Sequence, residues 1–120
     1  MEPKHLYIAG SLQAAWQQKD FDLLQSILAE DVMWHEGPYE QALTSPESVV
    51  EQWQRDLFNQ QDISASVTLA DFVDERGYFK FEASWVDNRG EPFELNGVFI
   101  MSLTEEGKVQ HFMQWWAAQD

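Results

Sequence analysis

Apolar residues in the first part of the chain recur three or four residues apart, which is the spacing of helices. Between residues 3 and 18 they form one face, made of Leu6, Ala9, Leu12 and Trp16 with Ile8 and Ala15 alongside. Asp20 then has the chemistry of an N-cap. The short helix expected after it carries Leu23, Leu24, Ile27 and Leu28.

A third predicted helix begins near Thr44 or Ser45. Thr44 and Glu47 have the spacing of a capping box, and Pro46 suits the first turn. The apolar face of this helix repeats every four residues, at Val49, Trp53 and Leu57, with Val50 on the same side. The first half of the chain is therefore expected to be mainly helical.

From residue 63 onward the apolar period changes to two, the period of strands. The expected strands are residues 63–73, 78–86, 93–103 and 109–117. Hairpin-turn sequences separate them, namely Glu75-Arg76-Gly77, Asn88-Arg89-Gly90 and Glu105-Glu106-Gly107. An antiparallel meander follows from this pattern. Gly97 lies inside a strand, where it would permit a bend or a bulge.

The order of elements predicts one α+β domain over residues 1–120. A curved antiparallel sheet should pack against three N-terminal helices as a cone that encloses a pocket. A further short strand is expected at residues 31–35, ended by Glu36-Gly37-Pro38. The alternative is a cone packed solid by its own aromatic side chains, without a pocket.

Several segments resemble proteins of the SnoaL-like, or nuclear transport factor 2-like, superfamily. The segment from Asp31 to Pro38 and the capped helix after it are similar to the family's first strand and third helix. Four later segments are similar to the family's last three strands: Trp85-Val-Asp-Asn-Arg-Gly90, Asn96-Gly97, Glu106-Gly-Lys-Val109 and Gln114-Trp-Trp116. The resemblance implies an α+β cone that forms a homodimer through the outer face of its sheet. Members include steroid isomerases, polyketide cyclases, dehydratases, epoxide hydrolases and non-catalytic binding modules, so the fold alone does not set the function.

Comparison with ketosteroid isomerase places Glu36 where that enzyme has its general-base carboxylate. The isomerase's oxyanion-hole tyrosine would fall on Leu12, and its protonated aspartate near Phe99. Neither side chain can donate a hydrogen bond. The resemblance therefore argues against steroid isomerisation by that mechanism. Tyr7 or Tyr39 would be a substitute donor, but no pattern places either ring inside the cone.

Strand alternation sorts the remaining candidates by face. If Glu36 points into the cone, Trp34 does as well and His35 points out. A strand slipped by one residue would reverse this and make His35 the base, so Glu36 and His35 are both candidate catalytic residues. The expected ligand-binding residues are Trp16, Trp34, Trp53, Phe99, Met101, Phe112, Gln114 and Trp116. The opposite face should carry Val98, Ile100, His111, Met113 and Trp115, as a dimer interface.

Composition agrees with a pocket and limits its chemistry. Six Trp and eight Phe are more large rings than a core of this size needs, which is typical of a ligand cavity or a subunit interface. The formal charge of −14 disfavours nucleic acid and anionic membranes as partners. The chain has no Cys, and its three His lack zinc-site spacing, so we expect no metal and no cofactor. The first ten residues do not resemble a signal peptide, and a cytoplasmic location is expected.

Two functions remain open at this point. The first is a cofactor-independent isomerase, dehydratase or cyclase, in which Glu36 is the base for a small apolar carbonyl-type substrate and Gln114 orients it. A carboxyl group among aromatic rings is desolvated, which raises its pKa toward neutrality and suits this role. The second is a non-catalytic module that binds a hydrophobic ligand or forms dimers.

Overall fold

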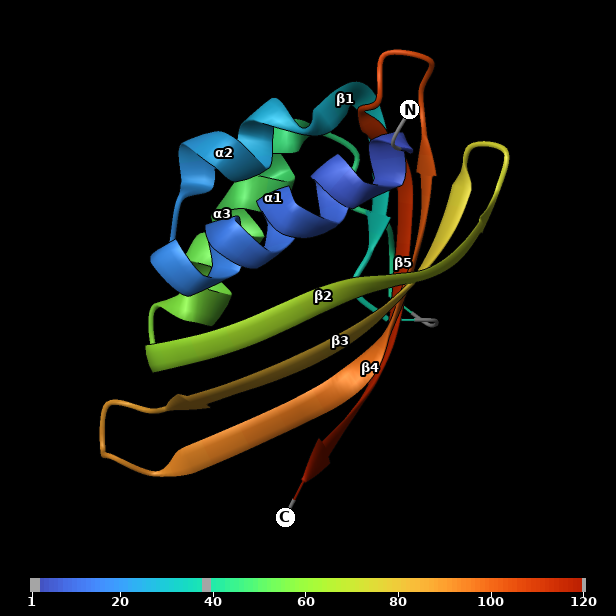
Figure 1. Cartoon of the computed structure of the whole chain (residues 1–120). Helices are drawn as coiled ribbons and strands as arrows, with labels where there is room; N and C mark the ends of the chain where they lie inside the picture. Colours follow the sequence, from blue (N-terminus) through green and yellow to red (C-terminus); the bar gives the residue numbers. More distant parts are fainter. Residues whose placement is uncertain (1–2, 38–39, 120) are drawn as a thin grey trace.

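Three helices lie together on one face of a strongly curved sheet in the computed structural model, which describes residues 3–37 and 40–119 (Figure 1). The helices are α1 (Lys4–Gln18), α2 (Phe21–Ser26) and α3 (Pro46–Leu57). The strands are β1 (Leu28–His35), β2 (Gln61–Val73), β3 (Arg76–Val86), β4 (Pro92–Leu103) and β5 (Val109–Gln119). The predicted α+β cone is confirmed, with a sheet that curves without closing.

The five strands are ordered β1-β5-β4-β3-β2. Strands β2 to β5 form the predicted antiparallel meander. Strand β1 pairs in parallel with β5, so that Trp34 is opposite Phe112 and His35 is opposite Met113. This pairing joins segments that are far apart in the chain and brings the residue after β1, Glu36, beside the middle of β5.

Local signals set the helix starts, with one correction. The Asp20 side chain caps α2 by accepting a hydrogen bond from the backbone N–H of Leu23, at 3.1 Å. The predicted capping box of Thr44 and Glu47 is wrong, because Pro46 occupies the first helical position and Ser45 is therefore the cap. Ser45 and Ser48 exchange the two capping hydrogen bonds, at 3.1 and 3.2 Å.

Two glycines have roles that differ from the predicted ones. Gly77 is not in the hairpin turn but inside β3, and the turn before it contains Asp74 with φ of 54°. No bulge occurs at Gly97, since β4 stays in register with β5 from residue 94 to residue 102. A Cβ at Gly97 would collide with the Trp115 carbonyl oxygen and approach the Phe81 ring to 2.6 Å. Gly97 thus permits close packing across the sheet.

The core lies between the helices and the concave face of the sheet. Alternate residues of β3, β4 and β5 enter it, which confirms the predicted strand faces. Two stacked pairs form its centre: Trp34 on Phe112, with ring centroids 3.6 Å apart, and Phe81 on Phe99, at 4.2 Å. Such stacking adds about 0.5–1.5 kcal/mol per pair to the burial of the rings.

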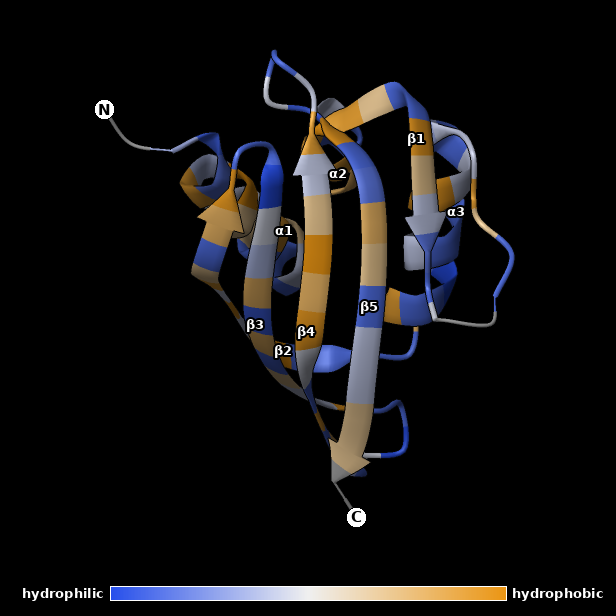
Figure 2. Ribbon diagram, turned by 90° about the vertical axis from the view of Figure 1, so that its right-hand side faces the viewer, coloured by the Kyte–Doolittle hydropathy of each residue, from blue (hydrophilic) through white to orange (hydrophobic). Residues whose placement is uncertain are grey.

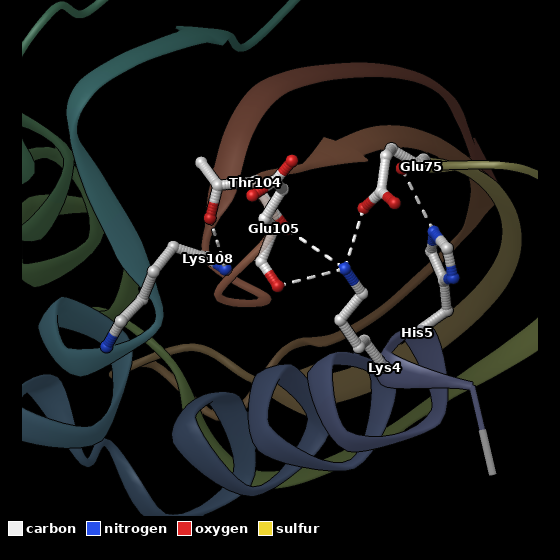
Figure 3. Close-up of polar contacts among 6 residues, drawn as sticks. All are labelled: Lys4, His5, Glu75, Thr104, Glu105 and Lys108. Atoms are coloured by element: carbon white, nitrogen blue, oxygen red, sulfur yellow. Dashed lines mark hydrogen bonds and ion pairs between the residues drawn. The ribbon is translucent and has the colours of Figure 1, made fainter. Parts of the chain in front are cut away.

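The start of α1 closes one end of the cone (Figure 3). Lys4 Nζ lies 2.9 Å from the Glu75 carboxylate and donates to the carbonyl oxygens of Thr104 and Glu105. His5 Nε2 lies 3.0 Å from the Glu75 carbonyl oxygen. One helix end therefore contacts both the β2–β3 turn and the β4–β5 turn. The opposite end of α1, at Trp16, is where the interior opens.

Figure 2 views the sheet from the side away from the helices. This outer face carries the outward set expected from alternation. Val98 is 42% exposed and Trp115 is 38% exposed, and Ile100 and Met113 are partly exposed beside them. Within the described ranges, no helix has the length and apolar character needed to cross a membrane.

Candidate functional site

A cavity of about 380 Å³ opens at the wide end of the cone, between the ends of α1 and α3 and the concave face of the sheet. Its apolar wall consists of Trp16, Trp53, Trp85, Trp116, Phe81, Phe99, Leu57 and Leu95. Its polar groups are Glu36, Glu40, Asp56, Gln52, Gln60 and Gln114. An apolar cavity with a few converging polar groups is the usual form of a small-molecule site.

Glu36 reaches the cavity from the residue that follows β1. Gln114, on β5, donates from Nε2 to Glu36 Oε2 at 2.8 Å and to the Glu36 carbonyl oxygen at 2.7 Å. The other carboxyl oxygen, Oε1, is buried and has no hydrogen-bond partner among residues 3–37 and 40–119. One oxygen is thus held in place by Gln114, and the second is shielded from solvent.

The surroundings of Glu36 make its carboxyl group a weak acid. Burial is the largest cause, and together with the nearby Asp56 and Glu40 carboxylates it raises the pKa from 4.5 to about 7. The indole N–H of Trp34 opposes this by favouring the ionised form, although it lies outside hydrogen-bond geometry. At neutral pH the group is therefore divided between its protonated and ionised forms.

Asp56, on α3, is a second carboxyl group with a perturbed pKa at this cavity. Burial raises its pKa, and Glu40 adds to this. A hydrogen bond of 2.9 Å from Gln52 and the charge of Arg55 act in the opposite direction without cancelling it. Clusters of perturbed carboxyl groups in a cavity are typical of functional sites.

Gln60 is a buried amide at the cavity wall, only 7% exposed. Its Oε1 accepts a hydrogen bond of 2.9 Å from the indole Nε1 of Trp16. Because an indole N–H can only donate, this bond fixes which end of the amide is the oxygen. The Nε2 group forms no hydrogen bond with the part of the chain that the structure describes. It is a free donor at the wall of the cavity.

The structure brings together most of the residues that were predicted from the sequence to form the site. Glu36 lines the cavity with Trp16, Trp53, Phe99, Gln114 and Trp116. Trp34, Met101 and Phe112 face the interior as expected but lie behind the wall, almost fully buried, and do not line the cavity. Their strand faces were predicted correctly, but alternation carries no information on depth.

His35 lies on the opposite face of β1 and does not line the cavity. Its Nδ1 is 3.4 Å from the Glu40 carbonyl oxygen. Of the two tyrosines considered as donors, Tyr7 is 65% exposed on α1, and Tyr39 lies outside the described residues. Leu12, at the position of the isomerase's tyrosine, is fully buried and is also absent from the wall.

Sequence reasoning missed Asp56 and Gln60. Asp56 follows Trp53 by three residues on α3, so it shares the face that Trp53 turns toward the cavity. That spacing was a usable signal. Gln60 follows the end of α3 and has no periodic signal, because its position depends on the contact with Trp16 across the cavity.

Among the described residues, no group of three or more His, Asp or Glu side chains is arranged to hold a metal ion. The carboxyl and amide groups of the cavity can transfer protons, form hydrogen bonds and attract positive charge.

Comparison with solved structures finds many with this fold. The epoxide hydrolase/cyclase-like enzyme SalBIII, which has a role in pyran ring formation in the polyether salinomycin, matches with a TM-score of 0.81 at 14% identity, over 95% of this chain and 90% of that one. A Mycobacterium tuberculosis protein solved with estradiol-17β-hemisuccinate matches with a TM-score of 0.78 at 14% identity, over 97% and 95% of the two chains.

A Catenulispora acidiphila protein with a ketosteroid isomerase-like fold, solved with trimethylamine, also matches. Its TM-score is 0.78 at 14% identity, over 90% of this chain and 83% of that one. No curated protein matched the sequence. The SnoaL-like domain family, however, matches residues 9–112, which include nearly every element around the cavity. The chain is therefore a pocket-bearing member of the SnoaL-like domain family.

Proposed function

We propose that this protein is a cofactor-independent enzyme that moves a proton on a small, largely apolar carbonyl compound, with Glu36 as the base. The observation that carries the proposal is the state of the Glu36 carboxyl group, which lines an aromatic cavity, is held there by Gln114 and has a pKa of about 7. A general base works best when its pKa is near the operating pH.

Each polar group then has a defined part in the reaction. The Glu36 carboxylate takes the proton from the carbon next to the carbonyl, while Gln114 holds the carboxylate in place through Oε2. The electron pair of the broken C–H bond moves onto the carbonyl oxygen, which becomes an enolate. Gln60 Nε2 donates a hydrogen bond to that oxygen. Return of the proton from Glu36 to another carbon gives isomerisation. Loss of a hydroxyl group from the β-carbon, with that proton transferred to it so that it leaves as water, gives dehydration.

Gln60 supplies the donor that the comparison with ketosteroid isomerase left missing. Leu12 and Phe99 cannot donate at the two positions where that enzyme has its oxyanion-hole residues. The Gln60 amide reaches the cavity from a different element, and its orientation is fixed by Trp16. A preorganised donor of this kind contributes more than a mobile one, because it needs no reorganisation as charge develops.

The structural neighbours support a role in small-molecule chemistry without naming a substrate. One is described as an epoxide hydrolase/cyclase-like enzyme, one is bound to a steroid hemisuccinate, and one is bound to trimethylamine. These ligands and reactions differ widely. The choice of substrate must therefore come from the side chains of this particular cavity.

The test is proton exchange, which needs no knowledge of the natural substrate. Small ketones and aldehydes are incubated with the protein in D₂O, and loss of the α-proton signals is followed by NMR. Glu36→Gln should slow the protein-dependent exchange by about 10²–10⁴-fold. The control is Glu94→Gln, which removes an equally charged but exposed residue of β4. Exchange that is equally fast in Glu36→Gln would contradict the proposal and favour a non-catalytic binding module.

A further inference from the structure

The charge at the cavity is unbalanced. Glu36, Glu40 and Asp56 all line it, and no Lys or Arg among the described residues does. The carboxyl groups act on one another, since Asp56 and Glu40 both disfavour ionisation of Glu36. Arg55 is the basic side chain whose charge acts on Asp56. It is exposed on α3, donates to Gln52 at 2.9 Å, and lies outside the cavity wall.

The walls of the same cavity have the electronic character that organic cations prefer. Four tryptophans line it: Trp16, Trp53, Trp85 and Trp116. Trp16 and Trp53 meet edge to face with ring centroids 5.8 Å apart. Trp116 is 54% exposed, so part of its ring is accessible to a molecule in the cavity. The negative face of an indole ring attracts ammonium groups, by about 0.5–2 kcal/mol per contact.

Two polar side chains of the cavity wall, Gln60 and Glu36, each have one atom without a hydrogen-bond partner among the described residues. Gln60 is more than nine-tenths buried, and its Nε2 has no partner within residues 3–37 and 40–119. Glu36 Oε1 is buried without a partner over the same ranges. Glu36 Oε1 is sealed from solvent and acted on by the Trp34 indole, so of the two atoms the Gln60 Nε2 donor is the one that a bound molecule can reach.

We propose that the molecule bound in this cavity carries a positively charged nitrogen, as an alkylammonium or quaternary ammonium group, held among the tryptophan rings and against Glu36, Glu40 and Asp56. A neutral apolar ligand would not relieve the repulsion that Asp56 and Glu40 exert on the ionised form of Glu36. A cation relieves that repulsion and stacks on the rings. This inference deepens the proposed function and rests on it only in identifying the bound molecule as the substrate.

The cation would also assist the proposed reaction. Positive charge beside a carboxyl group favours its ionised form. The substrate would therefore convert Glu36 from a mixture of forms to the carboxylate that accepts a proton. Binding at a pH near 6.5 should release protons to the buffer, whereas binding of a neutral ligand should not.

The test compares two probes of nearly equal shape, choline and its uncharged analogue 3,3-dimethylbutan-1-ol. Affinity is measured by calorimetry at pH 8 and low salt. We expect choline to bind at least about tenfold more tightly than the alcohol. Calorimetry in buffers of different ionisation enthalpy near pH 6.5 should show proton release with choline only. Equal affinities, a preference for the alcohol, or no saturable choline binding would overturn the inference.

Two variants distinguish choline binding in the cavity from general attraction of a cation to an acidic protein. Asp56→Asn should weaken choline binding about fivefold or more without changing alcohol binding, and Trp116→Leu, at a half-exposed position, should weaken it about threefold. Glu94→Gln should change neither. An equal loss in Glu94→Gln would mean diffuse attraction to an acidic surface and would overturn the inference.

The two proposals can fail separately. If exchange depends on Glu36 but choline shows no preference, the enzyme proposal stands and the charge inference falls. If choline binds preferentially but Glu36→Gln exchanges as fast as the unaltered protein, the charge inference stands for a binding protein.

Discussion

Glu36 should make the protein less stable as pH rises through neutrality. Its pKa is 4.5 in an ordinary setting and about 7 in the fold. Between these two pH values the folded protein still holds a proton that the unfolded chain has lost. The unfolded state binds fewer protons in this window, so the free energy of unfolding falls as pH rises across it. Below about pH 4.5 the penalty is absent, and above about pH 7 it is complete.

The size of the effect follows from the shift. A pKa difference from 4.5 to about 7 corresponds to about 3 kcal/mol, at about 1.4 kcal/mol per pKa unit. Glu36→Gln removes the ionisable group and keeps its shape and an oxygen that can accept from Gln114. The variant should therefore be about as stable as the unaltered protein near pH 4, and more stable by up to about 3 kcal/mol at pH 8.5. Asp56 contributes in the same direction in both proteins, because its pKa is raised as well.

Urea unfolding of both proteins at several pH values between 4 and 8.5 measures this difference. The general loss of stability from a net charge of −14 affects both chains and largely cancels. Glu94→Gln, which removes one exposed charge elsewhere, should not reproduce the pH-dependent gain. A difference between Glu36→Gln and the unaltered protein that stays constant to within about 0.5 kcal/mol across the range would refute the reasoning.

Three further predictions concern the fold and its assembly. Gly97→Ala should destabilise the protein by about 3 kcal/mol in urea unfolding, because the added methyl group has no room beside the Phe81 ring; a loss below about 0.5 kcal/mol would show that the sheet yields there. Ser45→Ala should cost about 1 kcal/mol by the same measurement through loss of the α3 cap, and an unchanged midpoint would contradict that. We also expect a homodimer through the outer sheet face, which sedimentation should show at micromolar concentration and which Trp115→Glu, at a 38% exposed position beside Ile100, should convert to monomer. A monomeric unaltered protein would contradict this expectation.

Features with a local cause were predictable from the sequence. Alternation along single strands put Trp34 and Glu36 on one side and His35 on the other; it left open which side faces the cone, and the comparison with ketosteroid isomerase favoured Glu36 and Gln114 inside. Turn chemistry at residues 88–90 and 105–107 separated the strands, and both of these turns contain a glycine with φ of 85°. These signals act over two to four residues, so no knowledge of the rest of the fold is needed to use them.

Features that depend on distant contacts were not predictable. The bond between Glu36 and Gln114 joins residues 78 positions apart through the parallel pairing of β1 with β5, and nothing near either residue signals that pairing. The sequence also contained no sign of how deeply an inward side chain is buried. Phe99 and Phe112 are both on the inner face, but only Phe99 reaches the cavity. Which of the two lies behind the wall depends on where the helices cover the sheet.

The place of β5 in the sheet also affects how the protein is made. It is the last strand in the chain, yet it lies between β1 and β4. At roughly 5–20 residues per second, Glu36 leaves the ribosome about 4–16 s before Gln114, its partner 78 residues later. Until β5 is synthesised, β1 lacks its hydrogen-bonding partner strand. The aromatic side chains packed under the helices are then not covered by β5. A nascent chain stalled before residue 109 would therefore expose an unpaired strand edge and apolar side chains. Chaperones and proteases recognise such incompletely folded chains.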